Sequence, residues 1–405
     1  MADLLVIADD LTGALDSGVQ LARKGQRVLV SLDCETGLDC AAETDVIVID
    51  SESRHDDPAV AYRKVHDLVS KSRTLGVRGV YKKTDSGLRG NVGSEIAAAL
   101  DASGASHLNF APAYPKQQRT TVDGIHYVAG TPLAKSFFSV DPLNPVHHSK
   151  VADLIHEQSD VAVASWSEGA DRRGVVVFDC ESDDDMRQVA QIVAADGEDV
   201  PMAGSAGLLE MLPARPCAGQ RRAQEDLPAR LVVVSGSVNA ITSSQLDEAE
   251  RRGAYRAHLP LKDILQGAWG EDEARAFTEE TLRSGADAPV VLIDTLGYQL
   301  SKEEIGDGSS AQLISRAASL CAAEVSAQRE RTVMIVGGDA LVGFVDRVGA
   351  TMLEPLDELF PGVVIARYEG GANEGTIVTK SGAFGSVGLF YDIQEALEEK
   401  VGGTA

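Results

Sequence analysis

The sequence predicts an α/β protein built from two Rossmann-like α/β domains with a cleft between them. The chain has 405 residues, which is more than one domain of about 150 residues accounts for. Short aliphatic runs alternate with helical stretches from the start, as is typical of a parallel sheet covered by helices on both faces. This alternation stops once, at residues 213–229, and then restarts. We therefore expect an N-terminal domain over 1–212, a linker over 213–229 and a C-terminal domain over 230–405.

Aliphatic runs bounded by turn residues predict the strands of the N-terminal domain. The expected strands are Leu4–Ala8, Arg27–Leu32, Val46–Asp50, Gly79–Lys82, His107–Ala111 and Gly174–Phe178. Helices are expected in the intervening stretches, at Thr12–Lys24, Pro58–Leu75, Val92–Ala102 and Asp184–Ala195. The glycine-rich segment 203–207 comes next, and we expect it to cap or extend the sheet.

Residues 213–229 read PARPCAGQRRAQEDLPA. The segment is rich in proline and charge and lacks apolar periodicity, which favours a linker. Strands are expected again beyond it, at Leu231–Val234, Val290–Asp294, Thr332–Val336, Val363–Ala366 and Thr376–Val378. No internal repeat of 20 to 50 residues is present, so the sequence does not favour a solenoid or a propeller.

Charge and cysteine content exclude several classes of partner. The chain carries 62 Asp and Glu against 37 Lys and Arg, a formal net charge of −25. A field of that sign repels nucleic acid and anionic membranes, so we expect neither as a partner. The five cysteines form no C-x-x-C pair, and the N-terminus has no export signal, which together favour the cytoplasm. A homodimer is a possible assembly, since two-fold dimers are the commonest oligomers.

Two adjacent carboxylates, Asp9 and Asp10, follow the first expected strand. Open parallel sheets bind ligands at the carboxyl ends of their strands. In the plainer alternative, Asp10 or Thr12 only caps the next helix. A cap needs one acceptor, whereas two carboxylates could hold sugar hydroxyls, position Mg²⁺ or accept a proton from an attacking hydroxyl. The pair therefore indicates a functional site, and the residues alone leave these three roles open.

Cations gather just after the fourth expected strand, where Lys82, Lys83 and Arg89 flank Asp85 and Ser86. In so acidic a chain, this segment predicts a local basic pocket for a carboxylate, with Arg89 as a bidentate fork. The alternative is a surface ion-pair cluster around Asp85.

Two further loops are expected to contribute to the same site. The segment 110–120 supplies Arg119 beside prolines that restrict the backbone. The loop 141–148 contains His147 and His148. Adjacent side chains usually diverge and no third ligand is spaced to join them, so we predict no metal site, and one polar contact from His148 to the substrate at most.

Three glycine-bearing loops follow strands of the C-terminal domain. Glycine lets the backbone approach a phosphate closely, and helix N-termini offer free N–H donors to it. One such loop is weak support, because glycine at a strand-to-helix turn is common for steric reasons alone; three together predict a nucleotide site. Its expected residues are Ser235, Ser237, Gly337, Gly338, Asp339 and Gly382. The absence of a P-loop and of a G-x-G-x-x-G after the first strand of either half disfavours a Walker NTPase and a dinucleotide enzyme.

Seven blocks, in order along nearly the whole chain, resemble the four-carbon acid sugar kinase family. They are IADDLTGALDSG (7–18), YKKTDSGLRGNVGSE (81–95), PAYPKQQRTTVDGIHYVAGTPL (112–133), DPLNPV (141–146), SGSVNAITSSQ (235–245), VGGDA (336–340) and KSGAFGS (380–386). The chain departs from the family pattern at Gly87, where Thr is more frequent, at Asp339-Ala340, where Glu-Thr is, and at Ala383, where Asn is.

This resemblance implies an ATP-dependent kinase that phosphorylates a terminal hydroxyl of threonate, erythronate or an oxo-tetronate in carbohydrate catabolism. It implies ATP and Mg²⁺ as cofactors, an acid-sugar-binding N-terminal domain and a nucleotide-binding C-terminal domain. The expected catalytic residues are Asp10, Asp9 and Asp85, and the expected substrate-binding residues are Lys83, Ser86, Arg89, Arg119 and His148. Two alternatives remain: a sensor that binds sugar acid and nucleotide without transfer, and a sugar-acid dehydrogenase. The three carboxylates argue against the first, and the missing dinucleotide fingerprint against the second.

Overall fold

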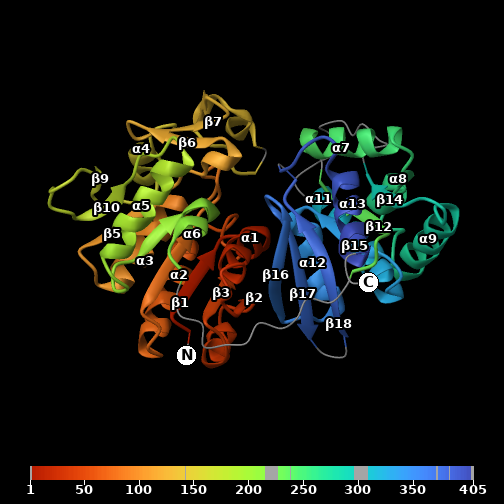
Figure 1. Ribbon diagram of the computed structural model, residues 1–405, viewed down its shortest axis with the longest axis horizontal. Helices are drawn as coiled ribbons and strands as arrows, with labels where there is room; N and C mark the ends of the chain where they lie inside the picture. Colours follow the sequence, from red (N-terminus) through yellow and green to blue (C-terminus); the bar gives the residue numbers. More distant parts are fainter. Residues whose placement is uncertain are drawn as a thin grey trace. The chain divides into compact units, whose positions relative to one another are not determined.

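The computed structural model of the protein describes residues 2–141, 143–214, 227–237, 239–295, 309–370, 373–382 and 384–402. The chain divides into two compact units, Met1–Arg221 and Arg222–Ala405, and each contains its own sheet and helices (Figure 1). The linker expected over 213–229 falls mostly on residues 215–226, which lie outside the described residues. Its extent and the cleft between the domains stay predictions.

The strands described in the main sheet of the N-terminal domain all run parallel. Their order across the sheet is β2 (Val28–Ser31), β3 (Val46–Asp50), β1 (Leu4–Ala8), β4 (Gly79–Lys83), β11 (Met202–Gly204), β5 (His107–Ala111), β10 (Gly174–Val177) and β9 (Val163–Ser165). The central strand β1 reads LLVIA and is buried throughout, as a strand covered on both faces requires. Because parallel strands end at the same edge, the loops after β1, β3 and β4 lie close together.

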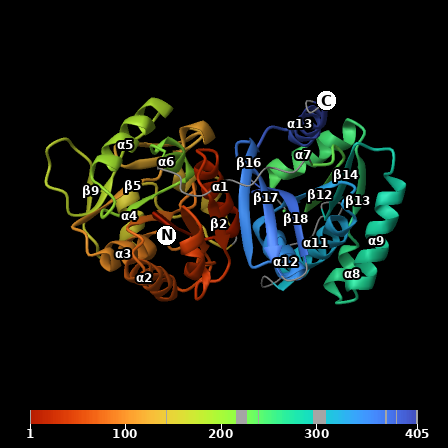
Figure 2. The same cartoon turned by 60° about the horizontal axis from the view of Figure 1, so that its bottom comes forward.

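Helices cover this sheet in two groups, which Figure 2 shows on opposite faces. The helix bounds are α1 (Leu11–Ala22), α2 (Pro58–Thr74), α3 (Val92–Ser103), α4 (Val151–His156), α5 (Asp183–Ala195) and α6 (Ala206–Met211). Helix α3 packs against α2 and α4, and α6 packs against α1 and α5. Local sequence sets where several of them begin: the Asp10 and Asp57 carboxylates cap α1 and α2, and Ser182 forms a capping box with Asp185 at α5.

A small antiparallel sheet and several 3₁₀ helices complete the N-terminal domain. The sheet consists of β6 (Arg119–Val122), β7 (Ile125–Val128) and β8 (Thr131–Pro132). The 3₁₀ helices are η1 (Gly37–Glu43), η2 (Pro115–Gln117), η3 (Leu133–Lys135) and η4 (Phe137–Val140). Strand β6 and helix η4 carry Arg119 and Phe138, two side chains of the site described below.

The sheet of the C-terminal domain is mixed. Its order is β13 (Tyr255–His258), β14 (Val290–Asp294), β12 (Leu231–Ser235), β15 (Thr332–Val336), β18 (Asn373–Lys380), β17 (Val363–Gly370) and β16 (Met352–Phe360). The first five strands in this order, from β13 across the sheet to β18, run parallel to one another. Strand β17 is antiparallel to both β18 and β16. The described helices are α7 (Ala240–Arg251), α8 (Leu261–Leu265), α9 (Glu271–Ser284), α11 (Ser309–Gln328), α12 (Gly338–Val348) and α13 (Leu389–Gly402).

The α/β class is confirmed, and the parallel sheet expected for the C-terminal domain is corrected to a mixed one. Five strands match their predicted bounds: Leu4–Ala8, Val46–Asp50, His107–Ala111, Val290–Asp294 and Thr332–Val336. The predicted strands beginning at Val363 and Thr376 are longer than expected, because they pair as a hairpin. Strand β16 was missed, since its sequence MLEPLDELF mixes carboxylates and a proline with apolar residues. In the part of the chain that is described, no helix has the length and apolar character needed to cross a membrane.

Candidate active site

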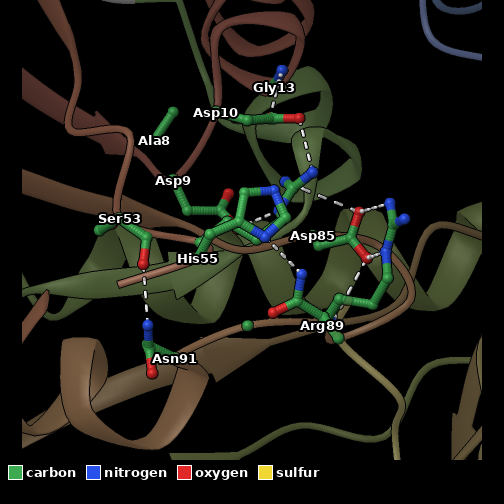
Figure 3. Close-up of polar contacts among 12 residues, drawn as sticks. Ala8, Asp9, Asp10, Gly13, Ser53, His55, Asp85, Arg89 and Asn91 are labelled. Carbon is green, nitrogen blue, oxygen red and sulfur yellow. Dashed lines mark hydrogen bonds and ion pairs between the residues drawn. The ribbon is translucent and has the colours of Figure 1, made fainter. Parts of the chain in front are cut away.

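A cluster of charged side chains lies at the carboxyl edge of the N-terminal sheet. Asp9 and Asp10 follow β1, Arg54 lies in the loop after β3, and Asp85 and Arg89 follow β4. Figure 3 shows the carboxylates of Asp9, Asp10 and Asp85 facing one common region. The sequence therefore predicted correctly that the segments that follow β1 and β4 lie at the same edge of the sheet.

Arg54 joins these carboxylates and was not among the residues chosen from the sequence. Its Nε donates to Asp9 Oδ2 at 2.8 Å, its Nη1 donates to Asp10 Oδ2 at 2.6 Å, and its Nη2 lies 3.9 Å from Asp85 Oδ1. Burial alone would lower the pKa of Arg54, but the three carboxylates raise it well above its usual value. A fixed positive charge thus organises the cluster.

The loop that carries Arg54 is held in place by a neighbouring helix. Asn91, at the start of α3, donates its Nδ2 to the carbonyls of Ser53 and Asp56 at 2.8 and 2.9 Å. The Ser53 hydroxyl donates in turn to the buried carboxylate of Glu95. A polar loop after a strand next to β1 was the available sequence signal for Arg54, and sequence reasoning did not use it.

The two adjacent carboxylates differ in their surroundings. Asp10 accepts from Gly13 N at 2.8 Å and from Thr12 Oγ1 at 2.9 Å, so it caps α1 as the plainer alternative held. Its side chain is 23% exposed, against 2% for Asp9. Burial would raise the pKa of Asp9, but Arg54 and the two lysines that end β4, Lys82 and Lys83, lower it. Its Oδ1 is buried without a hydrogen-bond partner among the described residues.

Arg89 forms an ion pair with Asp85 that is largely buried. Arg89 Nε and Nη2 donate to the two oxygens of Asp85 at 2.8 and 3.1 Å, and Nη1 donates to Asp141 Oδ2 at 3.1 Å. Burial would raise the pKa of Asp85, but Arg89 and then Arg54 hold it well below its usual range. The ion pair named as an alternative above is therefore present, but inside the site rather than on the surface. Because its fork already holds carboxylates of the chain, Arg89 is poorly placed to clamp a substrate carboxylate.

Two other cations in this region form no ion pair with any described residue. Lys83 is 4% exposed. A Cβ built on Gly13 would lie 3.2 Å from Lys83 Nζ and 2.5 Å from Asp10 Oδ1. The ammonium of Lys83 therefore lies beside the Asp10 carboxylate, where that carboxylate caps α1. By contrast, Lys82 pairs with the buried Glu95 at 3.0 Å, because neighbouring residues on a strand face opposite sides of the sheet.

Arg119 is the second such cation. It is 7% exposed, its Nη1 donates to the Gln117 carbonyl at 2.6 Å, and its Nε is buried without a hydrogen-bond partner in the described part of the chain. Burial lowers the pKa of Arg119 from its usual value, with Asp85 opposing that change. The guanidiniums of Arg119 and Arg89 both stack on the Phe138 ring, at 5.6 and 5.1 Å from its centroid.

Of the two remaining predicted residues, Ser86 lies on the same loop as Asp85, whereas His148 has a partner outside the cluster. The Ser86 carbonyl accepts from Nε2 of the buried His126 at 3.1 Å, and burial lowers the pKa of His126 to about 4, so this ring is neutral and fixes the loop. The ring of His148 is 41% exposed and pairs with Glu157 at 3.0 Å. In the part of the chain that the structure describes, no hydrogen bond or ion pair joins His148 to the cluster. From the same loop, Asn144 instead donates to His55 Nδ1 at 2.7 Å (Figure 3).

The glycine loops of the C-terminal domain meet at the carboxyl ends of β12, β15 and β18. Gly236 N donates to the Val336 carbonyl and Gly337 N to the Lys380 carbonyl, both at 3.1 Å. A Cβ on Gly382 would collide with the Ser237 hydroxyl. The predicted residues Ser235, Ser237, Gly337, Gly338, Asp339 and Gly382 therefore belong to adjoining loops.

The start of α12 lies in one of these loops, and among the described residues no side chain caps it. Gly337 precedes the helix with a φ of +111°, a backbone conformation that favours glycine, and Gly338 is its first residue. The exposed Asp339 lies in the first turn. Ala383, one of the departures from the family pattern, lies outside the described residues. Across the described ranges, no group of three or more His, Cys, Asp or Glu side chains is arranged to hold a metal ion.

Comparison with known proteins agrees with this division of the chain. Residues 4–212 match the family model described as sugar-binding N-terminal domain, and residues 232–390 match the nucleotide-binding C-terminal domain. A D-erythronate kinase of Heliobacterium modesticaldum is 30% identical, with 95% of each chain covered. A D-threonate kinase of Salmonella typhimurium is 29% identical, with 98% of each covered. A 3-oxo-tetronate kinase of Methylobacterium radiotolerans is 26% identical over 95% of this chain and 96% of its own.

Solved structures share the fold. A protein from Salmonella typhimurium LT2 superimposes with a TM-score of 0.76 at 21% identity, covering 97% of this chain and 99% of its own. A Haemophilus influenzae protein gives a TM-score of 0.69 at 20% identity, covering 97% of this chain and 100% of its own. The two domain matches and the full-length relatives lead to one conclusion: the chain belongs to the four-carbon acid sugar kinase family.

Proposed function

We propose that the protein is an ATP-dependent kinase that phosphorylates a terminal hydroxyl of a four-carbon sugar acid. The observation that carries the proposal is the pair of buried cations, Lys83 and Arg119, which form no ion pair with any described residue. Burying an unpaired charge is costly, so such cations call for an anionic ligand. They lie in the domain that also presents Asp9 and Asp10, and the relatives named above act on three different C4 acids.

Lys83 and Arg119 would bind the substrate carboxylate. A guanidinium and an ammonium both donate charge-assisted hydrogen bonds to carboxylate oxygens. Carboxylates of the cluster lie near both cations, but no described carboxylate is within ion-pair distance of either one. Arg89 would act differently from the sequence-based expectation: held by Asp85 and Asp141, it would position the loop after β4 and support Phe138. Ser86, on that same loop, would offer its hydroxyl to the substrate.

Asp10 would orient the attacking hydroxyl and accept its proton. Three of the roughly four lone-pair positions of this carboxylate are occupied, by Gly13 N, Thr12 Oγ1 and Arg54 Nη1. One position on Oδ1 is left, and the side chain is partly exposed, unlike that of Asp9. In the reaction, the hydroxyl oxygen bonds to the γ-phosphorus, the bond from that phosphorus to the ADP oxygen breaks, and the proton passes to Asp10.

ATP would bind to the glycine loops of the C-terminal domain through backbone N–H groups and the start of α12. Mg²⁺ would accompany the nucleotide and neutralise charge on its phosphates. Among the described carboxylates, Asp339 suits that ion, because it is exposed and adjoins Gly337 and Gly338. Asp9 and Asp10 suit it poorly, since both are bonded to Arg54. The described cysteines are free thiols, which supports a cytoplasmic location; a homodimer stays a prediction.

The test is ADP release by the full-length protein with ATP and Mg²⁺, measured with D-threonate, D-erythronate and 3-oxo-tetronate in turn. We expect ADP release that depends on one of these acids, and a product carrying phosphate on its terminal carbon by ³¹P and ¹³C NMR. If acid and nucleotide bind without turnover, the protein is a sensor. If turnover instead requires a nicotinamide cofactor, it is a dehydrogenase. Either result overturns the proposal.

A further inference from the structure

Lys380 is a buried cation at the carboxyl end of β18. It is 1% exposed, and its partners across the sheet are Val336 of β15 and Val363 of β17. Its Nζ donates to the carbonyls of Ser381 and Gly382 at 2.9 and 3.3 Å. Within the described ranges it forms no ion pair, so the charge of the ammonium is uncompensated.

The groups around Lys380 do not supply that compensation. Burial lowers the pKa of Lys380 to about 7, and no nearby charge contributes to the change. The strands on either side present valines to it. The carboxylates on the adjoining segments are Asp339, exposed in the first turn of α12, and Asp392, which accepts from Ser386 Oγ at 3.2 Å.

The position of this ammonium coincides with the glycine loops. Gly337 N donates to the backbone carbonyl of Lys380. The Gly382 carbonyl accepts from Lys380 Nζ and also from Thr242 Oγ1, the latter at 2.8 Å. An ammonium has three N–H donors, and two of them have acceptors here. When the amine is protonated, one donor and its positive charge are left at the point where the three loops meet.

We propose that Lys380 binds the polyphosphate of the nucleotide and supplies the positive charge that the glycine loops lack. This inference rests on the proposed function and adds to it a charged residue for phosphate recognition. A backbone cradle made of glycine N–H groups carries only partial charges, whereas a polyphosphate carries several negative charges. A buried ammonium at the same place gains an anionic partner when the nucleotide binds.

The competing explanation is purely structural: the ammonium holds the Ser381 and Gly382 carbonyls and does nothing else. Lys380→Met removes the charge and keeps most of the volume, and Lys380→Arg restores the charge. Calorimetry on the full-length protein with ADP and with adenosine separates the two explanations. We expect Lys380→Met to weaken ADP binding by about tenfold or more, as loss of a charge-assisted hydrogen bond gives, to leave adenosine binding within about twofold, and Lys380→Arg to recover part of the loss.

The pH dependence provides a second readout. An anion favours the protonated amine, so the advantage of wild type over Lys380→Met for ADP should be full below pH 7 and shrink as the pH rises toward 9. An equal loss for ADP and adenosine, or an advantage that does not change with pH, would overturn the inference and leave the structural role. If wild type binds neither ADP nor adenosine, the proposed function itself has failed, and that result is distinct from failure of Lys380 alone.

Discussion

The ring of Phe138 occupies the space where a side chain on residue 87 would lie. A Cβ built on Gly87 would lie 2.6 to 2.7 Å from three ring carbons, nearer than real contacts allow. The same ring is stacked against the guanidiniums of Arg89 and Arg119. Only glycine at position 87 leaves room for Phe138 to reach the two cations, and the two residues together shape this part of the candidate site.

Gly87→Thr should destabilise the fold and weaken acid binding together. The new side chain has to displace a buried ring, and overpacking of this kind costs about 1 to 3 kcal/mol. Urea unfolding and the KM for the acid measure the two effects. Phe138→Ala in the Gly87→Thr background should give back part of the loss, so that the double variant is more stable than the sum of the single changes predicts. Strict additivity would show that the two residues do not depend on each other.

Arg119→Gln and Lys83→Met should each raise the KM for the acid by about 10- to 100-fold, the equivalent of one charge-assisted hydrogen bond. The kcat should change far less, because the carboxylate does not react and is bound equally in ground and transition states. Arg78→Gln is the matched control: Arg78 immediately precedes β4, at the opposite end of the strand from Lys83, and pairs with Asp199 on the surface. A fall in kcat at unchanged KM would contradict the assignment of the two cations.

Sequence patterns predicted most strands of the N-terminal sheet because β1, β2, β3 and β10 are largely continuous aliphatic runs. Strand β9, which reads VAS and is mostly exposed, was missed, and β11, in the glycine-rich segment expected to cap or extend the sheet, lies inside it between β4 and β5. Strands β16 and β13 escaped prediction for the opposite reason. Pro355 and the carboxylates of β16 resemble a loop, and β13 reads YRAH, with most of its residues only half-buried. Hairpin pairing between β17 and β18 is a tertiary event that lengthens both strands beyond their apolar cores.

The site was predictable only where residues share a strand end. Asp9, Asp10 and Asp85 lie together because β1 and β4 are parallel neighbours. Arg54 belongs to a polar loop that, taken alone, reads as a solvated turn, and its role depends on a strand order that the sequence does not state. The stacking of Phe138 on cations from two other segments depends on packing between chain regions about 20 and 50 residues away, which no local pattern encodes.

Asp10→Asn should lower kcat by about a hundredfold or more with little change in acid affinity. Asparagine is as good a helix cap as aspartate, so the variant keeps the start of α1 while it removes the charge, the basicity and the ion pair with Arg54. Asp57→Asn is a matched control, because Asp57 caps α2 in the same way through Ala59 N at 2.9 Å. The kcat of Asp9→Asn should be measured alongside that of Asp10→Asn. If Asp10→Asn keeps near-normal kcat and Asp9→Asn does not, the base is Asp9.

Gly382→Ala should weaken ADP binding through a clash with Ser237. The added Cβ would meet the Ser237 hydroxyl and would lie 3.3 Å from the Asn239 Cβ, so the loops after β12 and β18 would have to move apart. Ser237→Ala in the same chain removes the hydroxyl and should restore much of the binding. Calorimetry with ADP on the two single variants and the double variant checks this. A double variant no better than Gly382→Ala alone would contradict the proposed clash.

The ion pair between Asp85 and Arg89 should stabilise the protein fully above about pH 4 and progressively less as the pH falls further. The pKa of Asp85 is held well below its usual range in the folded chain, whereas an unfolded aspartate titrates near about 3.9. A carboxyl whose pKa is lowered by folding contributes stability above its unfolded pKa and loses that stability as the pH falls through its folded pKa. Arg89→Ala removes the nearest cation from a buried carboxylate and leaves it with Gly87 N, at 3.1 Å, and the more distant charges of Arg54 and Lys83. We expect a cost of about 3 kcal/mol near neutral pH. The difference in unfolding free energy between wild type and this variant should therefore be largest from pH 6 to 8 and should narrow below pH 4.

Urea titrations from pH 3 to pH 8 measure this difference, with Arg187→Ala as a control because the ion pair of Arg187 with Asp184 is exposed. A difference that stays constant from pH 3 to pH 8 would mean that Arg89 stabilises the fold through its stacking on Phe138 rather than through Asp85.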